Sequence, residues 1–192
     1  WHTFAGASGT SEFSNSITIL NDGNYVAVGP AYGNIANLGG QAPLNAFAGV
    51  SDYWIIKYGT NGSVIWHTFA GVAGSSETAN SVAKTSDGGF IVAGSAGANV
   101  PSLGGQAPLV AYPGGTAIWI IKYTSAGAVQ WHTFSGASVS ADVSGILQAN
   151  DGGYTLVGKS SNNVASLGGQ APLNAHTLGG NDDVWIIKYN SS

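Results

Sequence analysis

The chain repeats itself three times at a fixed spacing. Trp1-His2-Thr3-Phe4 recurs at residues 66–69 and 131–134, 65 residues apart each time. Two longer motifs recur with it. Leu-Gly-Gly-Gln-Ala-Pro-Leu stands at 38–44, 103–109 and 167–173, and Trp-Ile-Ile-Lys-Tyr stands at 54–58, 119–123 and 185–189. Self-similarity at a fixed period marks a repeat architecture. We therefore expect a single repeat domain over 1–192, with units at 1–65, 66–130 and 131–192.

Each unit is predicted to hold four short strands and no helix. In the first unit the predicted strands are 16–20, 25–29, 53–58 and 64–69, which are rich in β-branched and aromatic residues. Asp22-Gly23 and Asn61-Gly62 supply the positive φ that tight hairpins need. A long loop separates the second predicted strand from the third.

Tandem four-stranded antiparallel units are typical of a β-propeller, in which each unit is a blade. Strands such as 54–56 are apolar on both faces, as expected when both faces pack on neighbours. The β-trefoil is the rival, but its units are usually shorter and these hairpins predict a plain meander. We expect an all-β fold, a β-propeller-like array of three four-stranded antiparallel blades, whose Trp54, Trp119 and Trp185 side chains are buried.

The same residues resemble a known bacterial repeat family. The motifs at 66–69, 87–94, 43–46 and 52–58 are similar to those of the repeat family named for the seven-bladed β-propeller, and the resemblance covers the whole chain three times. It implies a propeller fold, a secreted or surface location in bacteria, and no defined catalytic residues. Such repeats usually come in longer arrays than the three units found here.

The phase of the repeat predicts assembly. The chain begins on a match to the end of the fourth strand and finishes on a match to the third. Three blades are too few to close a ring, because known propellers have about four to eight. We expect a mixed blade of 1–4 and 185–189 in which the two segments come from different copies, giving a six-bladed ring or a filament. The predicted assembly residues are Trp1, His2, Thr3, Phe4, Trp185, Ile186, Ile187, Lys188 and Tyr189.

Composition excludes several classes of function. Only 7% of residues are charged and the net charge is −4, so a nucleic-acid partner is not expected. The longest apolar runs are too short for a transmembrane helix. The chain has no Cys, which removes disulfides and thiolate chemistry.

Its polar candidates repeat with the unit, which points to a scaffold and not to catalysis. His2, His67 and His132 occupy one position in the three units, whereas a catalytic set is normally unique in a chain. We therefore predict no enzyme activity, no metal site and no cofactor. The mid-strand lysines are expected to pair with interblade acids, and Asp residues in the hairpins are expected to accept hydrogen bonds from the turn backbone. These lysines are Lys57, Lys122 and Lys188, and the interblade acids are Glu12, Glu77 and Asp142.

Two functions follow from these observations. The leading one is a secreted, extracellular or cell-surface structural protein that binds other copies of itself. The alternative is a carbohydrate-binding lectin with one site per repeat in the long loop, where amide and ring side chains bind a glycan. Its candidate residues are Gln41, Asn45, Phe47, Gln106, Tyr112, Gln170, Asn174 and His176. In the structural interpretation the same loop packs over the neighbouring blade.

Overall fold

The structure, a computed structural model, describes residues 1–136, 140–164, 166–167, 169–176 and 181–190. In these residues the fold is all-β without a helix, and the strands form three antiparallel sheets. The first sheet contains β1 (Ser16–Ile19), β2 (Tyr25–Ala31), β3 (Asp52–Tyr58) and β4 (Val64–Ala70). The second contains β5 (Glu77–Lys84), β6 (Phe90–Ala96), β7 (Ala117–Tyr123) and β8 (Val129–Ser135). The third contains β9 (Ala141–Gln148), β10 (Tyr154–Ser160) and β11 (Asp183–Tyr189).

Strands and hairpins follow the repeat as predicted. Each sheet is a meander in which consecutive strands pair, and the Gly23 and Gly62 turns have φ of 80° and 82°. Of the predicted buried indoles, Trp54 and Trp119 are buried, whereas Trp185 in the third sheet is only half-buried. The described residues contain no helix long and apolar enough to cross a membrane.

A glycine recurs in the middle of each second strand because another backbone lies against it. A Cβ at Gly29, Gly94 or Gly158 would come within 1.7, 1.9 or 2.0 Å of a carbonyl oxygen just before or within the neighbouring strand. Two of these glycines lie where the strand pairing shifts register, at the bulges of the second and third sheets. The close approach explains why no other residue fits there.

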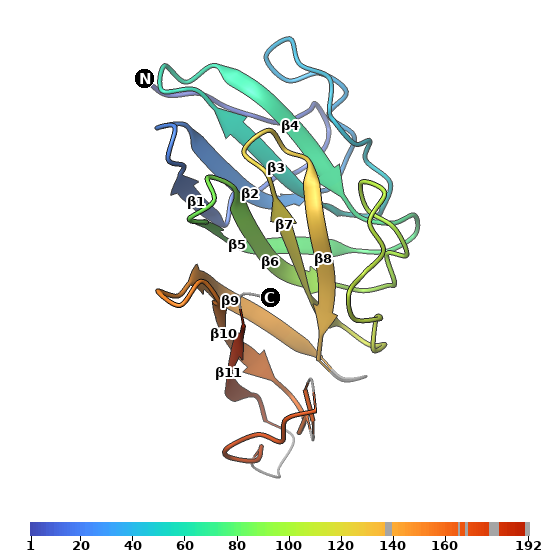
Figure 1. Cartoon of the computed structure of the whole chain (residues 1–192). Coiled ribbons are helices and arrows are strands. Elements are labelled where there is room, and N and C mark those ends of the chain that lie inside the picture. Colours follow the sequence, from blue (N-terminus) through green and yellow to red (C-terminus); the bar gives the residue numbers. More distant parts are fainter. Residues whose placement is uncertain (137–139, 165, 168, 177–180, 191–192) are drawn as a thin grey trace.

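The three sheets stack in chain order, from the first at the top of Figure 1 to the third at the bottom. Strand β5 contacts β1, β2 and β3, and β9 contacts β5, β6 and β7. Each junction therefore places the first strand of one sheet on the face of the sheet before it. Buried residues of both sheets form a continuous apolar cluster at each junction.

This arrangement confirms the expected antiparallel all-β fold and leaves the propeller a prediction. Four strands per unit holds for the first two sheets, but the third has three strands among the described residues. The sheets form an open array and not a closed ring: the chain start lies beside the first sheet, at the opposite end from β11 (Figure 1). No described strand pairs with the outer edge of β11.

Candidate functional site

The repeated Leu-Gly-Gly-Gln segment is a tight turn. Leu38 and Gln41 exchange backbone hydrogen bonds of 2.9 and 3.0 Å around Gly39 and Gly40, whose φ values are 57° and 87°. A type I′ turn needs positive φ at both central residues, which explains the glycine pair. The same bridge joins Leu103 to Gln106 and Leu167 to Gln170.

A buried histidine fastens this turn to the sheet. Trp54 Nε1 donates to His67 Nδ1 at 3.3 Å, and His67 Nε2 lies 3.1 Å from the Gln41 carbonyl. An indole N–H can only donate, so Nδ1 accepts and Nε2 carries the proton. Burial lowers the pKa of His67, against the opposing hydrogen bond to Gln41, which suits a neutral ring. We call this Trp–His–carbonyl arrangement the latch.

The second sheet contains the same latch. Trp119 Nε1 donates to His132 Nδ1 at 3.1 Å, and His132 Nε2 lies 2.9 Å from the Gln106 carbonyl. Burial lowers the pKa of His132 as well. Residues from three separate parts of the repeat thus meet at one point. Sequence reasoning assigned these histidines to the scaffold but missed this role, although the three motifs repeating together were a signal.

Beyond the turn, the loop pairs with the outer edge of the fourth strand. Leu44 N–H donates to the His67 carbonyl at 2.9 Å, and Phe69 N–H donates to the Asn45 carbonyl at 3.3 Å. The Asn45 amide also donates to Thr68 Oγ1 at 3.1 Å. Unpaired edges recruit other strands, so this loop covers the edge of β4. In the second sheet Leu109 pairs with His132 and Val110 with Phe134 in the same way.

Aromatic rings complete each latch. Phe69 stacks on Trp54 with an interplanar angle of 12°, and Phe47 from the loop meets Phe69 edge-on at 5.6 Å. In the second sheet Phe134 stacks on Trp119, also at 12°, and Tyr112 meets Phe134 edge-on at 5.4 Å. The fourth-strand phenylalanine is therefore held between the indole of β3 or β7 and a ring from the loop.

In the third repeat the latch is incomplete. Gln170 still forms its turn with Leu167, but no described residue occupies the positions of His132 and Phe134. A hollow of about 320 Å³ lies there, lined by Asn174, His176 and Trp185 among others. His176 Nε2 lies 3.0 Å from the Ser160 carbonyl and Nδ1 lies 3.8 Å from Asp183.

The N-terminal segment has a complementary arrangement. Trp1 packs edge-on against Tyr25 at 5.9 Å and donates through Nε1 to the Thr60 carbonyl. At the equivalent positions Trp66 stacks on Phe90 of the second sheet with an interplanar angle of 22°, and Trp131 packs edge-on against Tyr154 of the third. Trp1 thus lies where the fourth strand of a preceding sheet would place it. His2, Thr3 and Phe4, the next residues along, are exposed.

The repeated lysines pair with the hairpin aspartates. Lys57 meets Asp22 at 2.6 Å, Lys122 meets Asp87 at 2.8 Å and Lys188 meets Asp151 at 2.6 Å. These aspartates also accept from the turn backbone, as predicted. The sequence hypothesis assigned the lysines to the interblade acids; the structure places the hairpin carboxylates beside them instead, because hairpin and lysine strand are adjacent.

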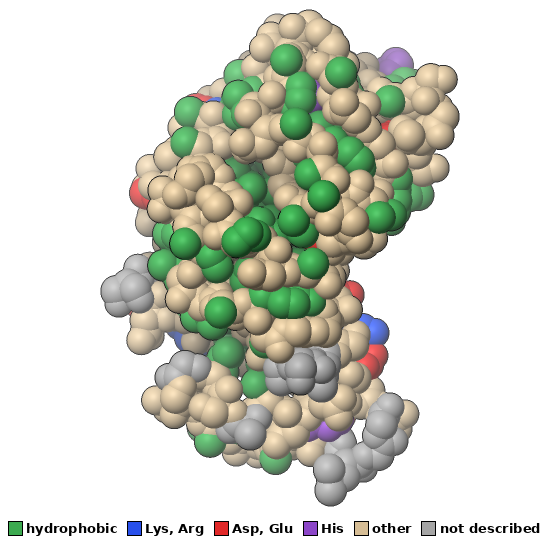
Figure 2. Space-filling model, turned by 90° about the vertical axis from the view of Figure 1, so that its right-hand side faces the viewer, with side chains coloured by type: hydrophobic (Ala, Val, Ile, Leu, Met, Phe, Trp, Pro, Cys, Tyr) green, Lys and Arg blue, Asp and Glu red, His purple; other side chains and the backbone are tan. Residues whose placement is uncertain are grey.

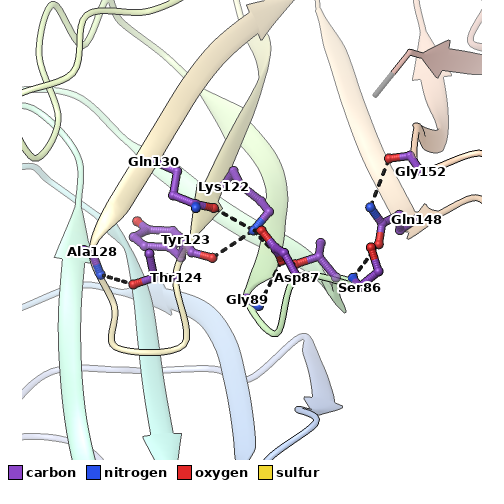
Figure 3. A network of polar contacts seen from close by, with 11 residues as sticks. Ser86, Asp87, Gly89, Lys122, Tyr123, Thr124, Ala128, Gln130, Gln148 and Gly152 are labelled. Atoms are coloured by element: carbon purple, nitrogen blue, oxygen red, sulfur yellow. Dashed lines mark hydrogen bonds and ion pairs between the residues drawn. The ribbon is translucent and has the colours of Figure 1, made fainter. Parts of the chain in front are cut away.

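Figure 3 shows the pair in the second sheet, whose lysine is the least exposed of the three. The side chain of Lys122 is 3% exposed, and its ammonium group also donates to Gln130 Oε1 at 2.7 Å. Burial acts to raise the pKa of Asp87, but hydrogen bonds from Lys122, Thr85 and Gly89 lower it to about 2. Asp87 therefore stays ionised beside a lysine that has little access to water.

Asp87→Asn is expected to destabilise the chain by about 2 kcal/mol, because it removes the charged partner of a buried ammonium group. The matched variant Asp151→Asn removes the partner of Lys188, which is 40% exposed, and is expected to cost clearly less because solvent screens this pair. Urea unfolding of both variants at neutral pH measures the difference. Equal losses would show that burial of the lysine does not set the cost.

Two buried carboxyl groups lie between the first and second sheets. Asp52 accepts from the backbone N–H groups of Ala48 and Gly49 at 2.7 and 2.8 Å. Glu77 accepts from the Val72 N–H at 3.3 Å, whereas its Oε1 has no hydrogen-bond partner. Burial raises the pKa of Glu77 to about 7, and the nearby Asp52 adds to the rise.

Glu77→Gln is expected to remove a pH dependence of stability. Because the folded pKa is raised from 4.5 to about 7, the contribution of Glu77 to stability is full below pH 4.5 and is lost as pH rises through 7. Gln stays neutral, so the variant is expected to gain up to about 3 kcal/mol over the parent at pH 8 and nothing at pH 4. Urea unfolding at both pH values measures this gain. Variant and parent share the same histidines, so their titration cancels in the difference between the two unfolding free energies. A difference that is the same at both pH values would contradict the prediction.

Several candidate glycan residues already make contacts inside the chain. Asn45 bonds Thr68 and Phe47 packs on Phe69, while the Tyr112 hydroxyl lies within hydrogen-bond distance of the Gly97 and Gly115 carbonyls. The side chains of Gln41, Gln106 and Gln170 are exposed, and Asn174 and His176 line the hollow of the third repeat. One face of the molecule shows scattered apolar patches with few charges among them (Figure 2).

Within the described ranges, no group of three or more His, Asp or Glu side chains is placed to hold a metal ion. No protein-family model matches the chain. No curated protein matches it either.

Proposed function

We propose that the protein is a non-enzymatic structural protein that assembles with further copies of itself through the two ends of its sheet array. The observation that carries this proposal is a difference between equivalent residues. Ile120 of β7 is 2% exposed under the third sheet, whereas its counterpart Ile186 of β11 is 66% exposed. At the other end, Val82 of β5 is 6% exposed and its counterpart Ile17 of β1 is 63% exposed.

Exposed apolar residues gather at both ends. On the third sheet Val184 and Val157 accompany Ile186, and on the first sheet Phe13 and Ile19 accompany Ile17. Contiguous apolar patches on a soluble protein mark sites where other molecules bind. Inside the array, Ala93, Ile118 and Ile120, the counterparts of the third-sheet patch, and Val82, the counterpart of Ile17, are buried against a neighbouring sheet. A further sheet of the same kind therefore fits these positions.

Internal junctions also repeat their polar contacts. The Asn15 amide donates to the Ala79 carbonyl at 2.9 Å, and the equivalent Asn80 donates to Val143 at 3.0 Å. The third sheet has Ser144 at this position. A junction at the open face of the third sheet therefore has a shorter polar side chain at this position and depends more on its other contacts.

We place this assembly outside the cell, as a secreted or surface component. The low charge, the abundance of Gly, Ala, Ser and Asn, and the absence of Cys support an extracellular building block. Detection of the protein in the medium or on the surface of the producing cell tests the location.

A glycan-binding lectin is the second candidate, and the hollow of the third repeat favours it. That hollow presents the amide of Asn174, the ring of His176 and the indole of Trp185, groups that hydrogen-bond and stack on sugars. In the second repeat the equivalent place between Trp119 and Tyr112 is occupied by Phe134, which argues against one site per repeat.

Light scattering coupled to size exclusion tests the leading proposal. We expect a particle mass that is a whole multiple, at least twofold, of the 19.3 kDa chain. A monomer at every concentration would overturn self-assembly. Binding to a glycan array, lost in Asn174→Ala, would then support the lectin.

A further inference from the structure

We propose that residues 1–4 of a second copy supply the missing fourth strand of the third sheet, with His2 completing the third latch and Phe4 filling the hollow beside Trp185. This inference rests on the proposed self-assembly and adds the side chains that perform it. It makes the latch of the third repeat a site built from two chains.

The acceptor side is already formed. The turn between Leu167 and Gln170 has backbone hydrogen bonds of 2.9 and 3.0 Å, the same values as in the first two repeats. In those repeats the Gln41 and Gln106 carbonyls face a histidine. The third repeat therefore presents an indole N–H donor and a turn carbonyl with the histidine between them still to be supplied.

The donor side carries the matching side chains in the matching order. Side chains alternate along a strand, so those of Trp66 and Thr68 point one way and those of His67 and Phe69 the other. Trp66 packs on the second sheet while His67 and Phe69 close the latch of the first. Trp1 packs on Tyr25, the equivalent residue of the first sheet. This position directs His2 and Phe4 toward a preceding sheet.

Exposure shows that these side chains lack their usual surroundings. Phe4 is 93% exposed, whereas Phe69 is 0% and Phe134 is 1% exposed. Trp1 is 69% exposed against 7% for Trp66. The counterparts of Phe4 are buried in both internal copies, so its exposure indicates an uncovered partner surface. The hollow of about 320 Å³ beside Trp185 lies where that partner surface is expected.

The acceptor belongs to a different copy because the second sheet lies between the two ends of one chain. β5 packs on the first sheet and β9 packs on the second, and the chain start lies at the far end of the array from β11 (Figure 1). The contact joins unlike surfaces, so it closes a ring or extends a filament.

The register follows from the internal sheets. Trp54 pairs with Phe69, Ile55 with Thr68 and Ile56 with His67, and the second sheet repeats this pairing. The mixed sheet therefore pairs Trp185 with Phe4, Ile186 with Thr3 and Ile187 with His2. Residues opposite each other in an antiparallel pair have Cα atoms about 4.5–5.5 Å apart, which is within reach of a disulfide.

Cysteine cross-linking tests this register, and the chain suits the test because it contains no Cys. A chain with Thr3→Cys is mixed with a chain with Ile186→Cys under mild oxidation, and we expect a disulfide-linked dimer of the two. The matched control replaces Ile186→Cys with Val157→Cys, which lies opposite Ile186 but one strand further from the new edge. The control is expected to give no cross-link.

Binding strength tests the latch itself. We expect His2→Ala to raise the dissociation constant of the assembly about tenfold, the effect of one lost hydrogen bond. Phe4→Ala is expected to raise the same dissociation constant about a hundredfold or more. Leu109→Ala, at an exposed loop position outside the junction, is expected to leave the constant unchanged.

The outcomes separate this inference from the proposed function. A monomeric parent would overturn both. An assembled parent without the Thr3–Ile186 cross-link, or with equal cross-linking of the Val157 control, would overturn the inference and leave self-assembly standing. If a chain that carries both cysteines forms the disulfide within one monomer, the strand comes from the same chain and not from a second copy, which would overturn the inference.

Discussion

Deletion of residues 1–4 is expected to convert the assembly into monomers while the β-sheet signal in far-UV circular dichroism stays unchanged. These four residues belong to no strand of their own chain, so the three sheets do not depend on them for pairing. They carry three aromatic rings, of which His2 and Phe4 have counterparts that are buried in both internal repeats. Loss of such rings costs several kcal/mol at an interface, enough to lower an affinity by more than a thousandfold.

Light scattering across a dilution series measures the result. Leu109→Ala serves as the control, because its side chain is exposed in the middle repeat and lies away from both ends. An unchanged particle mass after the deletion would contradict the assignment of residues 1–4 to the junction. A loss of the sheet signal would instead give these residues a part in folding.

Replacement of Trp119 by Ala is expected to destabilise the chain by roughly 3–5 kcal/mol, the largest loss predicted for a single substitution here. Trp119 is fully buried, stacks on Phe134 and lies 4.9 Å from the Tyr53 ring. Its removal leaves a cavity and also leaves His132 Nδ1 without its donor. Urea unfolding of Trp119→Ala in a chain that lacks residues 1–4 measures the free energy of folding alone, because this chain is expected not to assemble.

Trp185→Ala provides the matched comparison, since the two indoles hold the same place in their repeats. Trp185 is half-buried, so we expect a loss below about 2 kcal/mol in the same background. In the full chain we expect the variant to lose assembly. Equal destabilisation by the two substitutions would show that the third sheet is already complete without a partner.

Local signals in the sequence predicted the strands and turns well. Asp-Gly and Asn-Gly pairs flanked by apolar runs predicted hairpins, and Gly23 and Gly62 have the positive φ that this chemistry requires. The predicted strand 53–58 differs from β3 (Asp52–Tyr58) by one residue. Such features depend on neighbours in the chain, so one sequence is enough to find them.

Features that depend on distant residues were not predicted. The latch joins Gln41, Trp54 and His67 through bonds whose geometry only the folded loop provides. The lysine partners were assigned to the wrong acids for the same reason, because register decides that Lys57 lies beside the Asp22 turn.

The loop segments that cover the edges of β4 and β8 have a consequence for growth. Those edges are occupied, so in the proposed assembly further copies add at one donor end and one acceptor end. The chain would then be a bifunctional monomer of the kind used in step-growth polymerisation. For such monomers, cyclisation prevails on dilution and linear growth prevails at high concentration, because an intramolecular closure competes with the free chains around it. A variant with a blocked donor end then acts as a chain stopper, and its molar ratio to the parent sets the length of the product.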